Sequence, residues 1–332
     1  MPTLTPTLWD EFTNGDRRAC ARLITLVENH PDAIPDVHDQ LATRLGKAIR
    51  IGITGPPGVG KSTLNALLAL GLADRGHRVG LIAVDPSSPF TGGAFMGDRV
   101  RMDRLVGDDR IFMRSLASRE GTGGLSPATP YVADVLEGFG MDRILIETVG
   151  VGQAELDVMA CADIVVLVLQ PSTGDSIQSL KAGIIEAADI IVVNKADIPG
   201  VELALQALRF ALGLGKGRKD RPVPPLMPTS AQQSEGIDKL LDEIEAQAKR
   251  LVDSGRHLEM RRARIAREIR SGIERCLWEK YAARADAESG IAHAAEDLAR
   301  SGGSPYPFIG DACAKINITL DRKAETNDSQ DR

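Results

Sequence analysis

The chemistry of this chain is concentrated first in a nine-residue segment that follows a short apolar run. Its three glycines let backbone amides approach phosphate oxygens without obstruction by side chains, and the start of the following helix adds positive charge. Lys61 can reach the β and γ phosphates of a nucleotide, and the Ser62 hydroxyl can ligate Mg²⁺. The segment fills every position of G-x-x-x-x-G-K-[ST] and predicts a nucleoside triphosphate site; a glycine-rich turn that binds nothing is the alternative. The residues are Gly55, Pro56, Pro57, Gly58, Val59, Gly60, Lys61, Ser62 and Thr63.

A second motif, the tetrapeptide Asn-Lys-Ala-Asp that ends at Asp197, can read the base of that nucleotide. The Asp197 carboxylate can accept hydrogen bonds from N1–H and the exocyclic amine of guanine, which adenine cannot supply. The stem of Lys195 can cover the base, and Asn194 can either brace the loop or contact the purine. Further along, Ser230 and Ala231 are placed to offer a backbone amide to guanine O6. The two motifs together predict that the nucleotide is GTP.

An acidic residue after another apolar run completes the expected metal site. Glu147 can hold Mg²⁺ through its water shell, and the Gly150 amide can sense the γ phosphate. The usual acid at this place is aspartate, and the extra methylene of Glu147 favours contact through water. Val151 stands where many small GTPases carry the glutamine that orients the attacking water. We therefore expect slow unaided hydrolysis, with a partner or another residue completing the site.

The elements that must position these residues are short apolar runs that alternate with helix-length segments. Runs of this continuity are typical of strands covered on both faces, so they predict an α/β P-loop NTPase with a mostly parallel central sheet flanked by helices. Each motif follows one of these runs, and ligands of such sheets bind at the carboxyl ends of the strands. The runs are 51–53, 79–84, 111–116, 144–146, 164–169 and 190–193, with a last short candidate at 226–227.

Changes in periodicity divide the chain into four expected parts. We expect an N-terminal helical extension at 1–46, the GTPase domain at 47–254, a C-terminal helical dimerisation region at 255–321 and a disordered polar tail at 322–332. The third part carries a narrow apolar stripe, from Leu258 to Leu277, among five arginines. Two interpretations of the stripe stay open: a helix that pairs along a seam, or a helix packed on its own domain with a solvated arginine face.

Composition limits the other functions. The chain has 332 residues, 43% of them apolar, and a formal net charge of −6, which gives no support to nonspecific binding of nucleic acid or acidic membranes. The four cysteines lie too far apart to show a zinc motif or a disulfide framework. The start lacks the pattern of a secretion signal, and no apolar run approaches the roughly 18 residues of a membrane span. We therefore expect a soluble, cytoplasmic protein.

Three further strings carry a resemblance to a known family. Residues 84–89 read Val-Asp-Pro-Ser-Ser-Pro, 91–93 read Thr-Gly-Gly and lead to Gly-Asp-Arg at 97–99, and 147–153 read Glu-Thr-Val-Gly-Val-Gly-Gln. With the motifs above, they resemble the MeaB family, also labelled ArgK, over roughly Asp16 to Tyr281. These are GTPase chaperones of adenosylcobalamin-dependent methylmalonyl-CoA mutase. The resemblance implies a homodimer whose GTP cycle gates loading of adenosylcobalamin onto an acyl-CoA mutase and protects or rescues that partner.

The same resemblance implies roles for individual residues. Three acidic residues are expected to surround the metal and the catalytic water, with Ser62 and Lys61 beside them. A segment at 170–181 is expected to form an additional switch that signals to the mutase. From the residues alone, Asp85 can equally cap a turn, and Asp98 can equally be a solvated partner of a nearby arginine. The implied residues are Asp85, Asp98 and Glu147 for the metal and the water, and Gln170, Asp175 and Lys181 for the switch.

Two other functions remain as alternatives. A metal-delivery GTPase for a nickel enzyme usually carries histidine runs or Cys-Pro-His ligands near its switches, whereas the histidines here are scattered. A kinase of an amino-acid transport protein, the origin of the ArgK label, needs a site for a hydroxyl acceptor beside the γ phosphate, and no motif marks one. The histidines are His30, His38, His77, His257 and His293.

Overall fold

The protein is described from a computed structural model in which the chain forms two compact units, Met1–Arg261 and Arg262–Arg332. The nucleotide motifs all belong to the first unit, so this unit determines the geometry of the site. The residues that the structure describes are 3–86, 105, 107–118, 125–148, 154–171, 182–214, 222–283, 287–301, 307–308 and 311.

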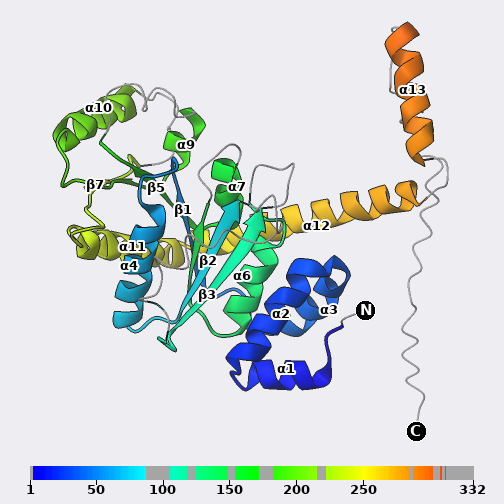
Figure 1. The fold of residues 1–332 in the computed structure, drawn as a ribbon, viewed down its shortest axis with the longest axis horizontal. Helices are drawn as coiled ribbons and strands as arrows, with labels where there is room; N and C mark the ends of the chain where they lie inside the picture. Colours follow the sequence, from blue (N-terminus) through cyan, green and yellow to red (C-terminus); the bar gives the residue numbers. More distant parts are fainter. Residues whose placement is uncertain are drawn as a thin grey trace. The chain divides into compact units, whose positions relative to one another are not determined.

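A seven-stranded sheet forms the centre of the first unit (Figure 1). Its order is β3-β2-β4-β1-β5-β6-β7, and every neighbouring pair is parallel, which confirms the predicted sheet. All seven apolar runs became strands; the side chains of β1, β5 and β6 are buried on both faces, whereas those of the edge strand β7 are partly exposed. The strands are β1 Ile49–Thr54, β2 Val79–Pro86, β3 Ile111–Ser118, β4 Arg143–Glu147, β5 Ile164–Leu169, β6 Ile190–Val193 and β7 Leu226–Pro228.

Helices cover the two faces of this sheet. Alternate residues of one strand join different cores: Leu145 packs in the core under α4 and α11, whereas Ile144 and Ile146 pack in the core under α6. Figure 1 shows α4 and α11 together on one side of the strands and α6 on the other. The helices of the first unit that follow the N-terminal region are α4 Lys61–Asp74, α6 Thr129–Gly138, α7 Ala154–Cys161, α9 Ala182–Ala187, α10 Val201–Leu214 and α11 Ile237–Asp253.

The N-terminal extension is helical, as predicted, and it shares the core beneath α6. The side chain of Asp16 caps the second helix by accepting hydrogen bonds from the backbone of Arg18 and Ala19. Next to this cap, the Arg17 guanidinium donates to the backbone oxygen of Ile111, which ties the helix to the start of β3. The elements are α1 Pro6–Thr13, α2 Arg17–Asn29, η1 Pro31–Ala33, α3 Ile34–Leu41 and η2 Ala42–Arg44.

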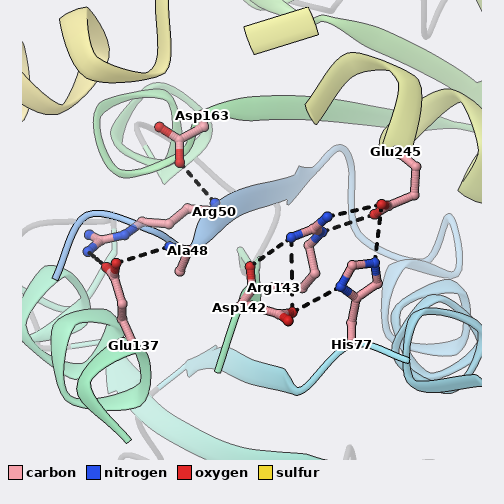
Figure 2. Close-up of polar contacts among 8 residues, drawn as sticks. All are labelled: Ala48, Arg50, His77, Glu137, Asp142, Arg143, Asp163 and Glu245. Carbon is pink, nitrogen blue, oxygen red and sulfur yellow. Dashed lines mark hydrogen bonds and ion pairs between the residues drawn. The ribbon is translucent and has the colours of Figure 1, made fainter. Parts of the chain in front are cut away.

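Charged side chains gather at the amino edge of the sheet, opposite the nucleotide motifs (Figure 2). Glu137 accepts from the Ala48 amide at 3.0 Å and from the Arg50 guanidinium at 3.3 Å, and Asp163 accepts from the Arg50 amide at 2.9 Å. Burial raises the pKa of Glu137, but the Ala48 amide and the charge of Arg50 outweigh that effect and hold the pKa below its usual value. These bonds fix where β1 begins.

A second cluster lies at the same edge. The side chain of Glu245, on α11, accepts from the Arg143 guanidinium at 3.0 Å and lies 3.1 Å from the His77 ring. Asp142 contacts the other nitrogen of His77 at 3.1 Å (Figure 2). The cluster joins α11 to the starts of β2 and β4, so it anchors that helix to the sheet.

The second unit is helical in its described part. It contains most of α12, Arg256–Ala282, and all of α13, Ala287–Ser301. Three isoleucines on α12 are about half exposed: Ile265, Ile269 and Ile273, at 43%, 58% and 55%. Among the described residues, no helix is both long and apolar enough to cross a membrane.

Candidate nucleotide-binding site

The strand order brings the motifs to one edge of the sheet. β1 lies between β4 and β5, and its register pairs Ile53 with Glu147 and Thr54 with Leu167. The segment 55–60 therefore leaves the sheet with the end of β4 on one side and the end of β5 on the other. The ends of β6 and β7, which carry the tetrapeptide and Thr229, follow beyond β5. This is the carboxyl edge, where parallel sheets bind their ligands.

Glycines of the phosphate loop meet strict geometric demands. A Cβ at Gly55 would lie 2.0 Å from the backbone oxygen of Val168, and a Cβ at Gly60 would lie 2.5 Å from the Asn194 side chain. Both glycines also have positive φ, 140° and 93°. Any other residue would separate the loop from β5 or from the base-reading loop.

The phosphate loop itself holds the Lys61 amine. Nζ donates to the backbone oxygens of Gly55 and Pro56 at 2.9 and 3.0 Å, and the side chain is buried at the start of α4. The positive charge is thus already placed within the loop whose amides we expect to bind phosphate. Thr63, which the sequence grouped with this segment, is exposed at the first turn of α4.

The predicted metal residues Ser62 and Glu147 lie in direct contact. Ser62 Oγ donates to Glu147 Oε1 at 2.6 Å, and Glu147 is only 4% exposed. A hydroxyl and a carboxylate are the hard oxygen ligands that Mg²⁺ prefers, so the residues present fit this ion. A third residue, which no motif predicted, joins Ser62 and Glu147: Asn65 Nδ2 donates to Glu147 Oε2 at 2.9 Å. Its position three residues after Ser62, on the same helix face, was the available signal.

Asn194 connects the base-reading loop to two other loops. Its Nδ2 donates to the Val59 backbone oxygen at 2.8 Å, and its Oδ1 accepts from the Ala231 amide at 3.0 Å and from the Thr229 hydroxyl at 3.2 Å. Asn194 is buried. Two roles were open for Asn194, bracing the loop or contacting the purine, and these contacts favour bracing.

Lys195 reaches in a different direction from the same loop. Its Nζ donates to the Gly58 backbone oxygen at 2.8 Å and to Gln170 Oε1 at 2.7 Å. The backbone of Lys195 has φ 59°, a left-handed conformation that a residue with a side chain adopts at a cost. The ammonium therefore links the phosphate loop to Gln170, which directly follows β5 and begins the predicted switch segment.

The Ser230 side chain orients Asp197, although the motif predicted only a backbone role for Ser230. Ser230 Oγ donates to Asp197 Oδ1 at 2.5 Å. The Ser230 amide donates to the Glu235 backbone oxygen, and the Ala231 amide donates to Asn194 Oδ1. The predicted backbone bond to guanine O6 is therefore not preformed, because both amides already have acceptors in the protein.

Several predicted residues fall outside the described part of the chain. Asp85 is the second-last residue of β2, so its backbone lies at the same sheet edge, but its side chain is not described. The others are Asp98, Gly150, Val151, Asp175 and Lys181.

Comparisons with known proteins agree with this fold. A protein of Pyrococcus abyssi named as a GTPase is 47% identical over 266 residues, which cover 80% of this chain and 82% of that one. The mouse mitochondrial protein named methylmalonic aciduria type A homolog is 35% identical over 266 residues, 75% of this chain and 64% of that one. A crystal structure of a LAO/AO transport system kinase superposes with a TM-score of 0.69 at 26% identity, covering 94% of this chain and 99% of that one.

The model of one protein family matches most of the chain. This family is described as methylmalonyl Co-A mutase-associated GTPase MeaB, and the match spans residues 20–286, which include the whole phosphate loop and the base-reading motif. The chain belongs to the MeaB family and is a P-loop GTPase.

Proposed function

We propose that this protein is a GTP-hydrolysing chaperone of an adenosylcobalamin-dependent acyl-CoA mutase, with methylmalonyl-CoA mutase as the expected partner. In this role the GTP cycle gates cofactor loading and protects or rescues the mutase. The family description supports the partner. The observation that carries the switch function is the position of Lys195, whose ammonium bonds both Gly58 in the phosphate loop and Gln170 at the end of β5.

The proposed roles at the site follow from the contacts. Lys61 passes from the loop carbonyls to the β and γ phosphates, while the loop amides bind the remaining phosphate oxygens. Ser62 would ligate Mg²⁺ directly, and Glu147 would hold a water of its shell. Bound Mg²⁺ would neutralise charge on the phosphates. Asp197, oriented by Ser230, selects guanine.

Other proposed parts of the site lie outside the described residues or at their border. Asp85 and Asp98 complete the acids around the metal and the attacking water, and Gly150 senses the γ phosphate. Asp175 and Lys181, with Gln170, form the switch toward the mutase. Hydrolysis is slow without the partner, because Val151 cannot orient water as a glutamine does.

We also propose a cytoplasmic homodimer that uses the C-terminal helices. The exposed isoleucines of α12 support this arrangement, since residues four apart lie on one helix face and burying them against a second copy removes apolar surface from water. Replacing Ile269 and Ile273 by aspartate should yield a monomer in sedimentation experiments. An unchanged dimer would contradict this use of the stripe.

A pull-down from cell extract tests the chaperone function. The protein is used as bait with GDP and, separately, with a nonhydrolysable GTP analogue, and retained proteins are identified by mass spectrometry. We expect an acyl-CoA mutase whose recovery differs between the two nucleotides. The Asp197→Ala variant, which should bind guanine nucleotides poorly, is the control and should remove that difference. Recovery of a nickel-enzyme precursor instead of a mutase would overturn the proposal.

The second candidate function is that of a kinase of an amino-acid transport protein. The similar solved structure is named as a transport system kinase. Incubation with GTP labelled in the γ phosphate, together with cell extract, separates the two functions. Release of all label as inorganic phosphate supports the GTPase chaperone, whereas transfer to a protein hydroxyl supports the kinase.

A further inference from the structure

Asn65 is a buried polar residue beside the proposed magnesium site. It lies on α4 with no exposed surface, and its Nδ2 donates to Glu147 Oε2 at 2.9 Å. The other carboxylate oxygen of Glu147 accepts from Ser62 Oγ at 2.6 Å. Two residues one helical turn apart thus hold the two oxygens of one carboxylate.

The orientation of the Asn65 amide is fixed by chemistry. An ionised carboxylate only accepts hydrogen bonds, so the amide must present its nitrogen to Glu147. Its oxygen, Oδ1, then faces away and has no hydrogen-bond partner among the described residues. A buried acceptor without a partner is unfavourable, and a leucine of similar size would avoid that cost. The contribution of asparagine here therefore lies in the bond that it donates to Glu147.

We propose that Asn65 is a positioning residue that sets the Glu147 carboxylate for the magnesium shell. Glutamate has one more rotatable bond than the usual aspartate, so its carboxylate can reach more positions. The Asn65 amide removes that freedom by holding Oε2, which leaves Oε1 beside the Ser62 hydroxyl.

The neutrality of the Asn65 donor suits this role. A lysine or arginine would also anchor the carboxylate, but its positive charge would oppose the binding of a cation nearby. A second acid at position 65 would repel Glu147 rather than hold it. Asparagine anchors one oxygen and leaves the negative charge available to the metal and its waters. This inference rests on the proposed magnesium site at Ser62 and Glu147.

The test is the Mg²⁺ requirement of nucleotide binding in the Asn65→Leu variant. Affinity for a fluorescent nonhydrolysable GTP analogue is measured over a range of Mg²⁺ concentrations and in EDTA. We expect the Mg²⁺ concentration for half-maximal effect to rise about tenfold, which corresponds to about 1.4 kcal/mol. Affinity in EDTA should stay within about twofold, because the hydrogen bond of Asn65 goes to Glu147, a proposed metal residue, and not to the phosphate loop. The electron paramagnetic resonance spectrum of bound Mn²⁺ should also differ between the wild type and the Asn65→Leu variant.

Matched variants separate positioning from general damage to the helix. Leu68→Ala also opens the core beneath α4 and should lower the melting temperature without changing the Mg²⁺ requirement. Asn65→Ala removes the donor with a smaller side chain and should shift the Mg²⁺ requirement as Asn65→Leu does. In the background of Glu147→Ala, the effect of Asn65→Leu should disappear, because Asn65 acts through that carboxylate.

The outcomes distinguish the two proposals. If Glu147→Ala raises the Mg²⁺ requirement but neither Asn65 variant does, the positioning role of Asn65 is wrong and the metal site stands. If Glu147→Ala leaves the requirement unchanged, the proposed metal site itself is wrong. An equal effect of Asn65→Leu with and without Glu147 would also overturn the positioning role.

Discussion

Replacing Asn194 by alanine removes the brace between three loops of the nucleotide site. The change deletes the bonds from Nδ2 to the Val59 backbone oxygen and from the Ala231 amide and Thr229 hydroxyl to Oδ1. Because Asn194 is only 2% exposed, water has little access to the groups left behind. The Val59 oxygen, the Ala231 nitrogen and the Thr229 hydroxyl each lose a buried partner.

The size of the effect follows from those three unpaired groups. A buried polar group without a partner costs about 1–3 kcal/mol, and local relaxation recovers part of this. We therefore expect the free energy of unfolding to fall by about 2–4 kcal/mol. Val59 belongs to the phosphate loop, so the loop also becomes less well ordered for its ligand. The affinity for GTP should fall at least about tenfold, which corresponds to about 1.4 kcal/mol.

Urea unfolding and nucleotide titration measure the two effects, and inorganic tripolyphosphate serves as a ligand without a base. If Asn194 acts as a brace, the affinities for GTP and for tripolyphosphate both fall. Asn194→Asp is the matched control: it retains acceptors for Ala231 and Thr229 but places a carboxylate against the Val59 oxygen, so it should also weaken both ligands. A variant with unchanged stability that loses affinity for GTP alone would refute the brace and indicate a contact with the purine.

Three further predictions concern other parts of the first unit. Asp197→Asn should lower GTP affinity and improve binding of xanthosine triphosphate, because an amide can donate to the xanthine C2 carbonyl; unchanged relative affinities in a titration would contradict this assignment. Gly60→Ala should lower the free energy of unfolding by about 1–3 kcal/mol in urea titrations, because its Cβ would lie 2.5 Å from Asn194 Nδ2 at a positive φ. Because the pKa of Glu137 is lower in the folded protein, its carboxylate stabilises the fold at pH values above the usual pKa of 4.5. This stabilisation is lost as the pH falls through the lower pKa of the folded state. Glu137→Gln should therefore unfold more easily than wild type at neutral pH, with the difference narrowing in acid; a difference independent of pH would show that the carboxylate charge is not involved.

The sheet was predictable from the sequence because its strands are apolar on both faces. The run 164–169 became β5 with the same limits, and 190–193 became β6. Periodicity also predicted the N-terminal helical extension, in which α2 formed. It did not identify α1, whose eight residues are too few to show a clear pattern.

The connections within the site were less predictable because they join residues distant in the sequence. Asn65 bonds a carboxylate 82 residues away, and Lys195 bonds a carbonyl 137 residues away. Sequence motifs name the residues that touch a ligand, but they do not name the neighbours that hold those residues. Ser230 shows the same limit: its hydroxyl bonds Asp197, whereas the sequence pointed only to the nearby backbone.

The link from Lys195 to Gln170 bears on how this GTPase can signal. Lys195 bonds Gly58 in the phosphate loop, and Asn194 bonds Val59 in the same loop, so the base-reading loop and the phosphate loop form one connected unit. Gln170 joins that unit through the Lys195 ammonium at 2.7 Å. A ligand that displaces or strengthens either contact of Lys195 changes the bonding of Gln170 at the same time. We propose that nucleotide occupancy would act through these contacts on the start of the switch segment, together with the sensing of the γ phosphate proposed for Gly150.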